Sequence, residues 1–446
     1  MSFTVVGGGP AGCLIAILLA RRGHSVEIFE RRGDPQSAPA EAGRSINLAL
    51  AARGIRALRE AGVLGDIAGL AVTLQGRMLH EPDCSEQFSP YGQREDEVIH
   101  SISRATLTAR LTAAARRLPN VQVNFSTACI GYEGEGRLRL RDVNSGREFT
   151  HTARRVIGAD GAGSALRQAL AAHLKFDVRE DRLDHDYKEL LVPLRAGQPQ
   201  LAMNALHIWP RGGFMLIALP NADGSFTATL FLSRSGVPGF DHLQDAAAVS
   251  AFFAREFPQA QALIPDLVGQ FLAHPQGMLG TVHCPRWRED ERLVLIGDAA
   301  HAIVPFHGQG MNCAFEDCRI LDELLADHPQ DAFARFEQAR RADTEAIARM
   351  ALENYGEMRD AVLEPRFQRQ KAVAMALERR HPAHFIPRYA MVMFHDRIPY
   401  SVALDRGQIQ QAILDALVPV DAPADYEPDW VQADRLVTER LAPISR

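Results

Sequence analysis

Residues 3–12 read FTVVGGGPAG, and this stretch decides the fold of the N-terminal part of the chain. An apolar, β-branched run leads directly into a cluster of glycines. Gly7 permits a tight turn, Gly9 lets the backbone approach a pyrophosphate, and Gly12 lets the following helix pack closely on the strand. The stretch therefore predicts a strand, a turn and a helix whose N-terminus binds the phosphates of a dinucleotide.

The residues that follow extend this unit. A helix is expected over 11–21 and a second strand over 26–30, so that Glu30 stands at the end of that strand. A carboxylate in this place accepts hydrogen bonds from ribose hydroxyls. A strand-to-helix turn without any ligand remains the alternative, and it accounts for the glycines but not for Glu30.

Two later segments indicate which dinucleotide is bound. Residues 158–167 read GADGAGSALR and contain Asp160, and residues 295–301 read LIGDAAH and contain Asp298. An acidic side chain at a strand end can hold a ribityl hydroxyl, and a helix from about Cys313 would direct its amides at the edge of a flavin where reduction places negative charge. Gly-Asp-Ala can also be a simple helix cap. The three segments in this order indicate one bound FAD.

Composition limits the class of protein. The chain has 446 residues, a formal net charge of −6 and 46 % hydrophobic residues, which argues against a nucleic-acid surface and fits a multidomain globular enzyme. We expect no membrane span, because no apolar stretch reaches the necessary length. We also expect no signal peptide and a cytoplasmic location. The six cysteines form no CxxC pair, so buried thiols are favoured over disulfides or a metal.

The pattern of hydrophobic residues and turns predicts an α/β protein, α+β overall. We expect a discontinuous Rossmann-like FAD-binding domain (1–75, 97–180 and 276–345), an inserted antiparallel-sheet substrate domain (76–96 and 181–275) and a C-terminal helical region (346–446). The antiparallel sheet is inferred from strand-like runs separated by glycine turns. These runs are at 207–210, 214–219 and 226–232, and a separate hairpin is expected from 137–141 and 148–152.

Beyond these motifs the chain resembles FAD-dependent aromatic hydroxylases of the para-hydroxybenzoate hydroxylase type, and among them the kynurenine 3-monooxygenase family. The stretches that carry the resemblance span nearly the whole chain: 44–50, 76–78, 90–92, 204–210, 214–231, 297–312, 353–355 and 385–389. The resemblance implies hydroxylation of L-kynurenine to 3-hydroxykynurenine with NADPH and O₂, through a flavin C4a-hydroperoxide. It further implies a soluble bacterial type, because mitochondrial members carry a C-terminal anchor and this chain ends in LAPISR.

The resemblance also implies the residues that bind substrate. Arg77 would hold the substrate carboxylate, Tyr91 would assist it, and Asn354 and Tyr389 would complete the polar contacts. Arginine binds a carboxylate bidentately, which makes these roles chemically reasonable. The walls of the ring pocket would be Leu206, Met215, Ile217, Phe231, Pro305, Phe306 and Met358.

Some of the residues expected to bind the cofactor come from the sequence motifs, and the others come from the family resemblance. The motifs themselves select Gly7, Gly9, Gly12, Glu30, Asp160, Asp298 and Gly310. The resemblance adds Ala11, Arg31, Arg44, Ala49, Arg104, Cys129, Met311 and Asn312, several through backbone atoms. FAD would be tight but non-covalent, and NADPH would bind transiently because only one dinucleotide fingerprint is present. Cys129 is expected to be a contact by position, without thiol reactivity, and no side chain is assigned as a general base.

Taken singly, each of these residues has an ordinary alternative. Arg77 could be a surface arginine, Tyr91 and Tyr389 could be packing aromatics, and Asn354 could face solvent. His301 and His307 lack the helical spacing of metal ligands, so no metal is expected. Three other functions remain open: a related monooxygenase for another anthranilate-like or tryptophan-derived amino acid, a non-enzymatic flavin-binding interaction module, and an NAD-dependent dehydrogenase. The oligomeric state is left open.

Overall fold

The computed structural model describes residues 1–35, 47–423 and 426–444. Its first layer is a six-stranded sheet in the order β18-β19-β12-β1-β2-β8, parallel except at the β18 edge. The strands are β1 (Ser2–Val6), β2 (Ser25–Phe29), β8 (Val121–Asn124), β12 (Val156–Gly158), β18 (Arg288–Glu289) and β19 (Leu293–Leu295). Buried apolar side chains on the strands and on the helix after β1 form one continuous core. Segments far apart in sequence thus meet in one sheet, which explains why the expected domain is discontinuous.

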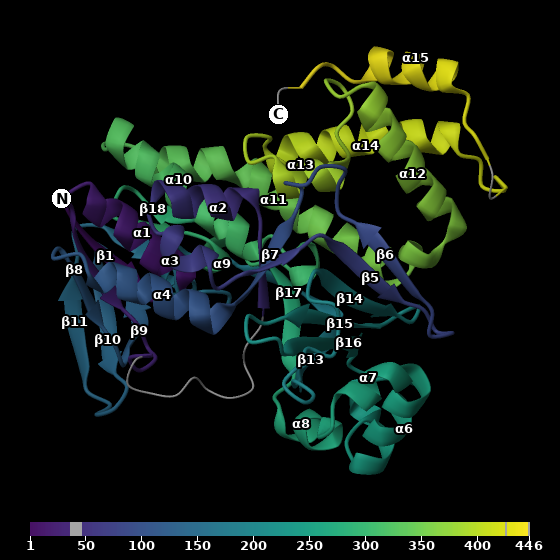
Figure 1. Ribbon diagram of the computed structural model, residues 1–446. Coiled ribbons are helices and arrows are strands. Elements are labelled where there is room, and N and C mark those ends of the chain that lie inside the picture. The colour runs from purple at the N-terminus through teal and green to yellow at the C-terminus, as the bar shows by residue number, and fades with distance from the viewer. Residues whose placement is uncertain (36–46, 424–425, 445–446) are drawn as a thin grey trace.

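Helices pack against this sheet beside its central strands (Figure 1). The glycine turn leads from β1 into α1 (Pro10–Arg21), and α1 contacts α4 (Arg104–Arg116) and α10 (Gly310–Asp327). A smaller sheet of β9 (Thr127–Tyr132), β10 (Arg137–Asp142) and β11 (Glu148–Thr152) lies beside α5 (Ala165–Leu174). The expected hairpin over 137–141 and 148–152 is confirmed as the antiparallel pair β10–β11.

The second layer is a seven-stranded sheet in the order β17-β13-β16-β15-β14-β5-β6. Its strands are β5 (Gly76–His80), β6 (Glu86–Pro90), β13 (Arg179–Val192), β14 (Ala205–Pro210), β15 (Met215–Pro220), β16 (Phe226–Ser233) and β17 (Gly277–His283). All pairs are antiparallel except β14 with β5, which run parallel. The sheet extends beyond the expected boundary at 275, since β17 pairs with β13.

The two faces of this sheet are covered differently. One face packs on α6 (Ala246–Glu256), α7 (Pro258–Leu263) and α8 (Leu267–Ala273) through a phenylalanine-rich core. The other face belongs to a core shared with the 304–306 segment and the C-terminal helices. The helices in this core are α11 (Ala332–Arg359), α13 (Arg388–Phe394) and the start of α14 (Tyr400–Leu417). The later part of α14 packs with α12 (Pro365–Arg380) and α15 (Trp430–Arg440) in a separate core. Helix α11 runs through the expected boundary at 345 without a break, so it joins the two regions rigidly.

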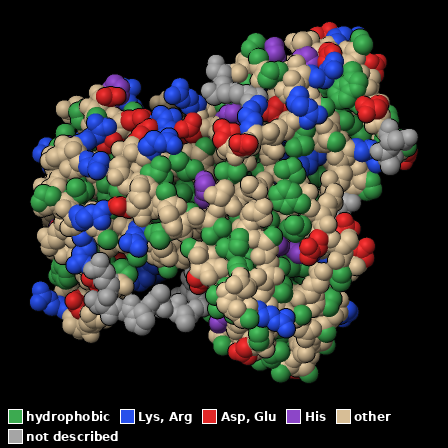
Figure 2. Space-filling view, in the orientation of Figure 1, with side chains coloured by type: hydrophobic (Ala, Val, Ile, Leu, Met, Phe, Trp, Pro, Cys, Tyr) green, Lys and Arg blue, Asp and Glu red, His purple; other side chains and the backbone are tan. Residues whose placement is uncertain are grey.

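A short sheet of β3 (Asn47–Leu50), β7 (Ile99–Ser103) and β4 (Val72–Leu74) lies between the two layers, and α2 (Ala52–Glu60) follows β3 and packs on α10. On the face seen in Figure 2, basic and acidic side chains are interspersed, without a broad patch of one sign. Among the described residues no helix is both long and apolar enough to cross a membrane. The six cysteines are free thiols; four are buried, Cys129 is half-buried, and Cys84, contrary to expectation, is exposed.

Candidate functional site

A cavity of about 300 Å³ lies between the second face of the seven-stranded sheet and the 302–308 segment. Ten of the eleven residues expected to bind substrate line it, from strands, loops and helices far apart in sequence. They are Arg77, Tyr91, Leu206, Met215, Ile217, Phe231, Pro305, Phe306, Met358 and Tyr389. Asp298 and Ala49 from the expected cofactor set line the same cavity. The cavity that holds the expected substrate residues therefore also reaches two of the residues expected to bind the cofactor.

One end of the cavity carries an arginine beside a stacked pair of tyrosines. The guanidinium carbon of Arg77 lies 4.9 Å from the ring centre of Tyr389 and 5.7 Å from that of Tyr91, and the two rings stack at 5.7 Å. Burial opposes the charge of Arg77, but the Tyr389 and Tyr91 hydroxyls hold its pKa above the usual value. Within the part of the chain that the structure describes, the Arg77 Nε and the Tyr91 hydroxyl are buried without a hydrogen-bond partner. This end therefore offers unused polar groups around a cation, as a carboxylate-binding site requires.

The middle of the cavity is apolar. Phe231 meets Phe306 edge-on at 5.0 Å, and Phe306 stacks on Tyr355 at 3.8 Å. Asn354 does not line this space, because its side-chain amide donates to the Phe306 carbonyl at 2.7 Å and contacts the Met358 sulfur at 3.2 Å. Its place in the structure is to fix the 305–307 turn (η2, Pro305–His307) against α11.

A polar side of the cavity was not foreseen from the sequence. Tyr187 and Glu189 of β13 and Thr227 and Thr229 of β16 also face it. Burial raises the pKa of Glu189 to about 7, opposed in part by the positive charge of Arg104. The signal was present, because side chains alternate along a strand and Phe231 predicts that Thr229 and Thr227 share its face.

The three dinucleotide motifs come together at the carboxyl ends of β1, β12 and β19, which are neighbours in the sheet. A Cβ on Gly7 would lie 2.4 Å from the Ala159 carbonyl oxygen, and one on Gly12 would lie 1.9 Å from the Gly7 carbonyl oxygen. A Cβ on Gly9 would meet nothing within 4 Å, so space remains open in front of α1. Gly9 caps α1 without a side-chain hydrogen bond, which leaves the first amides of that helix free for phosphate oxygens.

Glu30 lies at the end of β2 as expected, and the chain itself uses its carboxylate. One oxygen accepts from the Gly8 amide at 2.7 Å, and the other accepts from the Arg32 amide and guanidinium at 2.9 Å each. These bonds fix the glycine turn and the carboxylate together. A ribose hydroxyl would share this carboxylate with the backbone.

The third motif fits the flavin end of an FAD. Asp298 begins the short α9 (Asp298–His301), and its side chain accepts no hydrogen bond within the described residues. Helix α10 begins at Gly310, three residues before the expected start, and its first turn has no side-chain cap. Asn312 joins the parts, since its side chain bonds the Ala51 amide at 2.9 Å and the Ala49 and Gly308 carbonyls. Free helix amides beside an unpartnered acid match the polar edge of a flavin and its ribityl chain.

The remaining expected cofactor residues take several positions. Ala11, Met311 and Gly310 are half-buried near the helix starts, whereas Arg31 and Arg104 are exposed. Burial raises the pKa of Cys129 to about 12, so its thiol stays protonated. Asp160 accepts from the Ser164 hydroxyl at 2.5 Å and the Leu166 amide at 3.1 Å, and it thereby caps α5. Arg44 lies outside the described residues.

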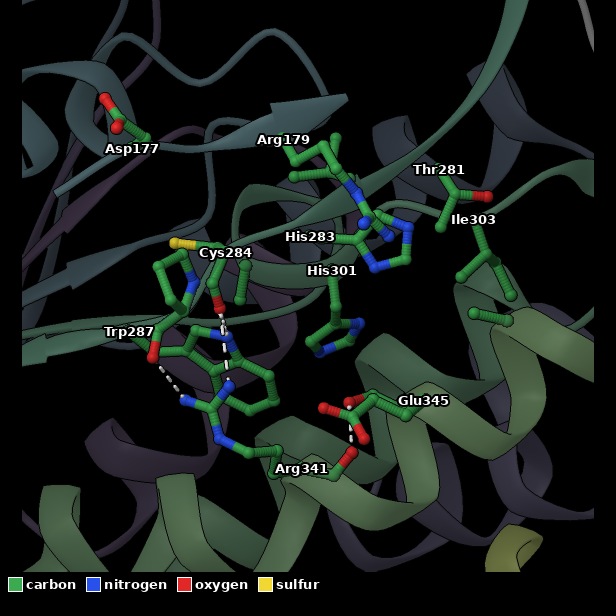
Figure 3. Close-up of a pocket in the computed structure, with 15 residues that line it drawn as sticks. Asp177, Arg179, Thr281, His283, Cys284, Trp287, His301, Ile303, Arg341 and Glu345 are labelled. Carbon is green, nitrogen blue, oxygen red and sulfur yellow. Dashed lines mark hydrogen bonds between the residues drawn. The ribbon is translucent and has the colours of Figure 1, made fainter. Parts of the chain in front are cut away.

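A second cavity, of about 400 Å³, lies between β17 and α11 and contains none of the expected substrate residues (Figure 3). Trp287 and Arg341 both line it, and the guanidinium carbon of Arg341 lies 5.1 Å from the centre of the Trp287 ring. His301 lines this cavity, and its Nε2 shares a hydrogen bond of 2.7 Å with the Asp317 carboxylate. Asp317 also accepts a hydrogen bond of 2.7 Å from the Arg340 Nε. His301, Cys313 and Asp317 are close enough to share a metal, but Arg340 already bonds both the acid and the thiol. We interpret the group as a buried ion-pair network.

Known proteins resemble this chain in sequence and in fold. The family model described as "FAD binding domain" matches residues 1–351. Kynurenine 3-monooxygenase from Xanthomonas campestris pv. campestris (strain 8004) is 46 % identical over 448 residues, covering 99 % of this chain and 97 % of the relative. The protein of the same name from Xanthomonas oryzae pv. oryzae (strain PXO99A) is 46 % identical over 451 residues, covering 99 % and 98 %.

Solved structures share the fold at low identity. A tetrameric form of 2-methyl-3-hydroxypyridine-5-carboxylic acid oxygenase superposes with a TM-score of 0.65 at 21 % identity, over 82 % of this chain and 94 % of the other. PqsL of Pseudomonas aeruginosa in complex with 2-aminobenzoylacetate superposes with a TM-score of 0.64 at 20 % identity, over 81 % and 97 %.

Proposed function

This chain belongs to the kynurenine 3-monooxygenase family and carries an FAD-binding domain, and from this premise we propose that it hydroxylates L-kynurenine to 3-hydroxykynurenine with O₂ and NADPH. The observation that carries the proposal is a single cavity with an unpaired arginine at one end, an apolar middle and the flavin site at the other. A dehydrogenase or a non-enzymatic flavin module does not agree with near full-length relatives of this name.

The arginine end suits the amino-acid part of kynurenine. Arg77 would bind the α-carboxylate through two parallel N–H donors, and the hydroxyls of Tyr91 and Tyr389 would bond the remaining carboxylate lone pairs. Burial raises the pKa of both tyrosines, so both hydroxyls remain donors at neutral pH. The stacked pair of Tyr91 and Tyr389 packs beside the guanidinium and would bring both hydroxyls to the same end of the cavity as the carboxylate.

The register of the sheet then places the aromatic ring. Arg77 stands opposite Leu206 on β14, whereas Ile217 on β15 stands opposite Ile208, two residues further along β14. Two strand spacings cross about 10 Å of the sheet and two residues along a strand add about 7 Å, so Ile217 and Met215 lie diagonally across the sheet from Arg77. The ring would therefore lie on Ile217 and Met215, with Phe231 beside it and Phe306 above.

FAD, when bound and reduced, supplies the activated oxygen for this reaction, and the side chains supply position and dryness. Phe306, stacked on Tyr355, lines the apolar middle of the cavity, and the turn that Asn354 holds would limit the entry of water there. Burial lowers the pKa of the neighbouring His307 to about 3, so this ring is neutral and adds no charge near the flavin. No side chain is required as a general base in this arrangement.

The proposal includes NADPH as a transient reductant and a cytoplasmic location. All six cysteines are free thiols in the structure, and reducing compartments are where such thiols persist. The side-chain roles given above for Arg77, Tyr91 and Tyr389, and those of the FAD-site residues, belong to the same proposal.

The test is NADPH oxidation by the purified, FAD-loaded protein with and without L-kynurenine, with the product followed by mass. We expect a kynurenine-stimulated rate and a product heavier by about 16 Da, the mass of one oxygen atom transferred from O₂. Stimulated oxidation that yields peroxide and no hydroxylated product would contradict kynurenine as the substrate. Related anthranilate-like and tryptophan-derived amino acids would then be tested on the same preparation.

A further inference from the structure

A lysine from the C-terminal helices reaches the carboxylate end of the cavity. Lys371 lies on α12, and its Nζ donates to the hydroxyl of Ser89 on β6. Ser89 stands directly opposite Arg77 in the antiparallel pair of β5 and β6. Directly opposed residues point to the same side of a sheet and have Cβ atoms about 5 Å apart. Arg77, Ser89 and Lys371 are therefore neighbours on the cavity side of the sheet, although Lys371 does not line the cavity itself.

The two cations have no acidic partner there. Within the described residues, no carboxylate forms a salt bridge with either Arg77 or Lys371. The acid that acts on Arg77 from a distance is Glu357, and its carboxylate is bonded to Arg388 at 2.9 Å. Burial, and then the charge of Arg77, lower the pKa of Lys371 to about 8. A pair of like charges without a counter-ion is a site that an anion stabilises.

We propose that Lys371 is a second cation of the carboxylate subsite, a positioning residue that strengthens the binding of an amino-acid substrate and takes up a proton when the carboxylate arrives. This inference rests on the proposed function, since it concerns the carboxylate that Arg77 would bind. The proton comes from solvent and forms the ammonium from the neutral amine of Lys371; no other bond changes. The carboxylate offsets the repulsion between the two cations, so the charged form of Lys371 becomes the favoured form.

The tyrosines and the histidine around the subsite do not change charge at the pH at which Lys371 does. Burial raises the pKa of Tyr91 and Tyr389 from 10 and lowers that of His307 to about 3. On the α12 side, Glu378 accepts from Gln93 at 2.8 Å and from Arg94 at 3.3 Å. Arg379 donates to the Gln93 side-chain oxygen at 2.5 Å, so it too is committed to a partner.

The experiment measures the Kd of L-kynurenine for the FAD-loaded enzyme, by flavin absorbance, from about pH 7 to about pH 9, the range in which a lysine with its pKa near 8 changes charge. For the wild-type enzyme we expect affinity to fall with rising pH, because charged Lys371 is lost. Lys371→Met should weaken binding at neutral pH by roughly five- to tenfold, the effect of one charge just beyond contact near a protein surface. Lys371→Arg should keep the affinity and remain charged throughout.

A further measurement separates this role from a structural one. Calorimetry near pH 8 in buffers of different ionisation enthalpy should show uptake of roughly half a proton by the wild type, because a group at its pKa is half charged before binding. Neither Lys371→Met nor Lys371→Arg should show that uptake. Titration of the ligand's own ammonium is common to all variants and cancels in the comparison.

Lys188→Met is the matched control, since Lys188 is another lysine of lowered pKa, buried on the opposite face of β13 and bonded to the Phe271 carbonyl. It should change stability without changing the Kd of kynurenine or its pH dependence. Unchanged affinity and unchanged proton uptake in Lys371→Met would overturn the inference and leave the proposed function intact. A wild-type enzyme that binds no kynurenine would instead refute the proposed function.

Discussion

Replacing Arg77 by methionine tests the centre of the proposed site. The two side chains have similar length, so the change removes the guanidinium and little volume. Among the described residues Arg77 has no carboxylate partner and its Nε is unsatisfied, so its loss leaves no acid of this part of the chain without a partner. We therefore expect the free energy of unfolding to stay the same or to rise slightly, which is unusual for a buried arginine.

Binding should suffer instead. Two charge-assisted hydrogen bonds contribute about 1.5–3 kcal/mol each, and the carboxylate would retain the hydroxyls of Tyr91 and Tyr389 in the variant. A loss of about 3 kcal/mol is the expected outcome, equivalent to a roughly 150-fold rise in the Kd of L-kynurenine. The assay is titration of the FAD-loaded enzyme, together with flavin content and the melting temperature.

The decarboxylated analogue of kynurenine makes the test specific. The wild type should bind this analogue about 3 kcal/mol more weakly than kynurenine, while Arg77→Met should not distinguish the two ligands. Arg211→Met is the control, because Arg211 bonds only main-chain carbonyls, those of Glu256, His80 and Pro210. An Arg77→Met enzyme that binds kynurenine within about threefold of wild type, or still prefers it to the analogue, would refute the reasoning.

Four other substitutions examine the rest of the site. Gly12→Ala places a Cβ 1.9 Å from the Gly7 carbonyl oxygen and should lower the yield of soluble protein. The Cβ of Gly9→Ala meets no protein atom within 4 Å, so this variant should fold but lose FAD, as measured by the flavin-to-protein absorbance ratio. Full flavin content in both variants would contradict the phosphate site. Asn354→Ala leaves the Phe306 carbonyl without its partner, which should lower the free energy of unfolding by about 1–3 kcal/mol and weaken kynurenine binding. A lower melting temperature with unchanged kynurenine affinity would show that the 305–307 turn is not part of the substrate site. For Glu189, the folded pKa of about 7 exceeds the unfolded value, so its neutral form is favoured in the fold at low pH and stability is lost as pH rises through 7. The melting temperature of Glu189→Gln should therefore rise relative to that of the wild type between about pH 5 and about pH 8. A difference between the two melting temperatures that stays constant with pH would show that the Glu189 carboxyl is not desolvated.

The accuracy of the sequence analysis varied along the chain for physical reasons. The glycine turn at 7–12 and the hairpin 137–141/148–152 depend on local backbone geometry, and both agree with the structure to within a residue or two. The start of α10 was placed three residues late, because Gly310 and Asn312 are poor helix formers and tertiary bonds hold them in the first turn. The edge of the seven-stranded sheet was missed at β17 because pairing partners distant in sequence leave no local signal.

The residues of the candidate site divide in the same way, into those that the sequence pattern predicts and those that only their packing reveals. Residues that the family pattern carries, such as Arg77, Tyr389 and Phe231, lie around one cavity, and their substrate roles remain predictions to be tested. Glu189 and Lys371 were not selected, because each becomes notable only through what packs against it. Asn354 was selected for a contact with substrate, whereas the structure bonds it to the Phe306 carbonyl.

The sequence by itself determined that the chain has a dinucleotide-binding strand-turn-helix, an inserted sheet and a helical C-terminal region, because glycine positions, strand alternation and helix periodicity are local properties. It also determined the family, because those residues recur in a fixed order. Only the tertiary structure decided that β1, β12 and β19 are neighbours, that no described acid pairs with Arg77, and that a lysine from α12 bonds Ser89 opposite it. Burial and the balance of charge depend on which surfaces meet, and the sequence does not specify this residue by residue.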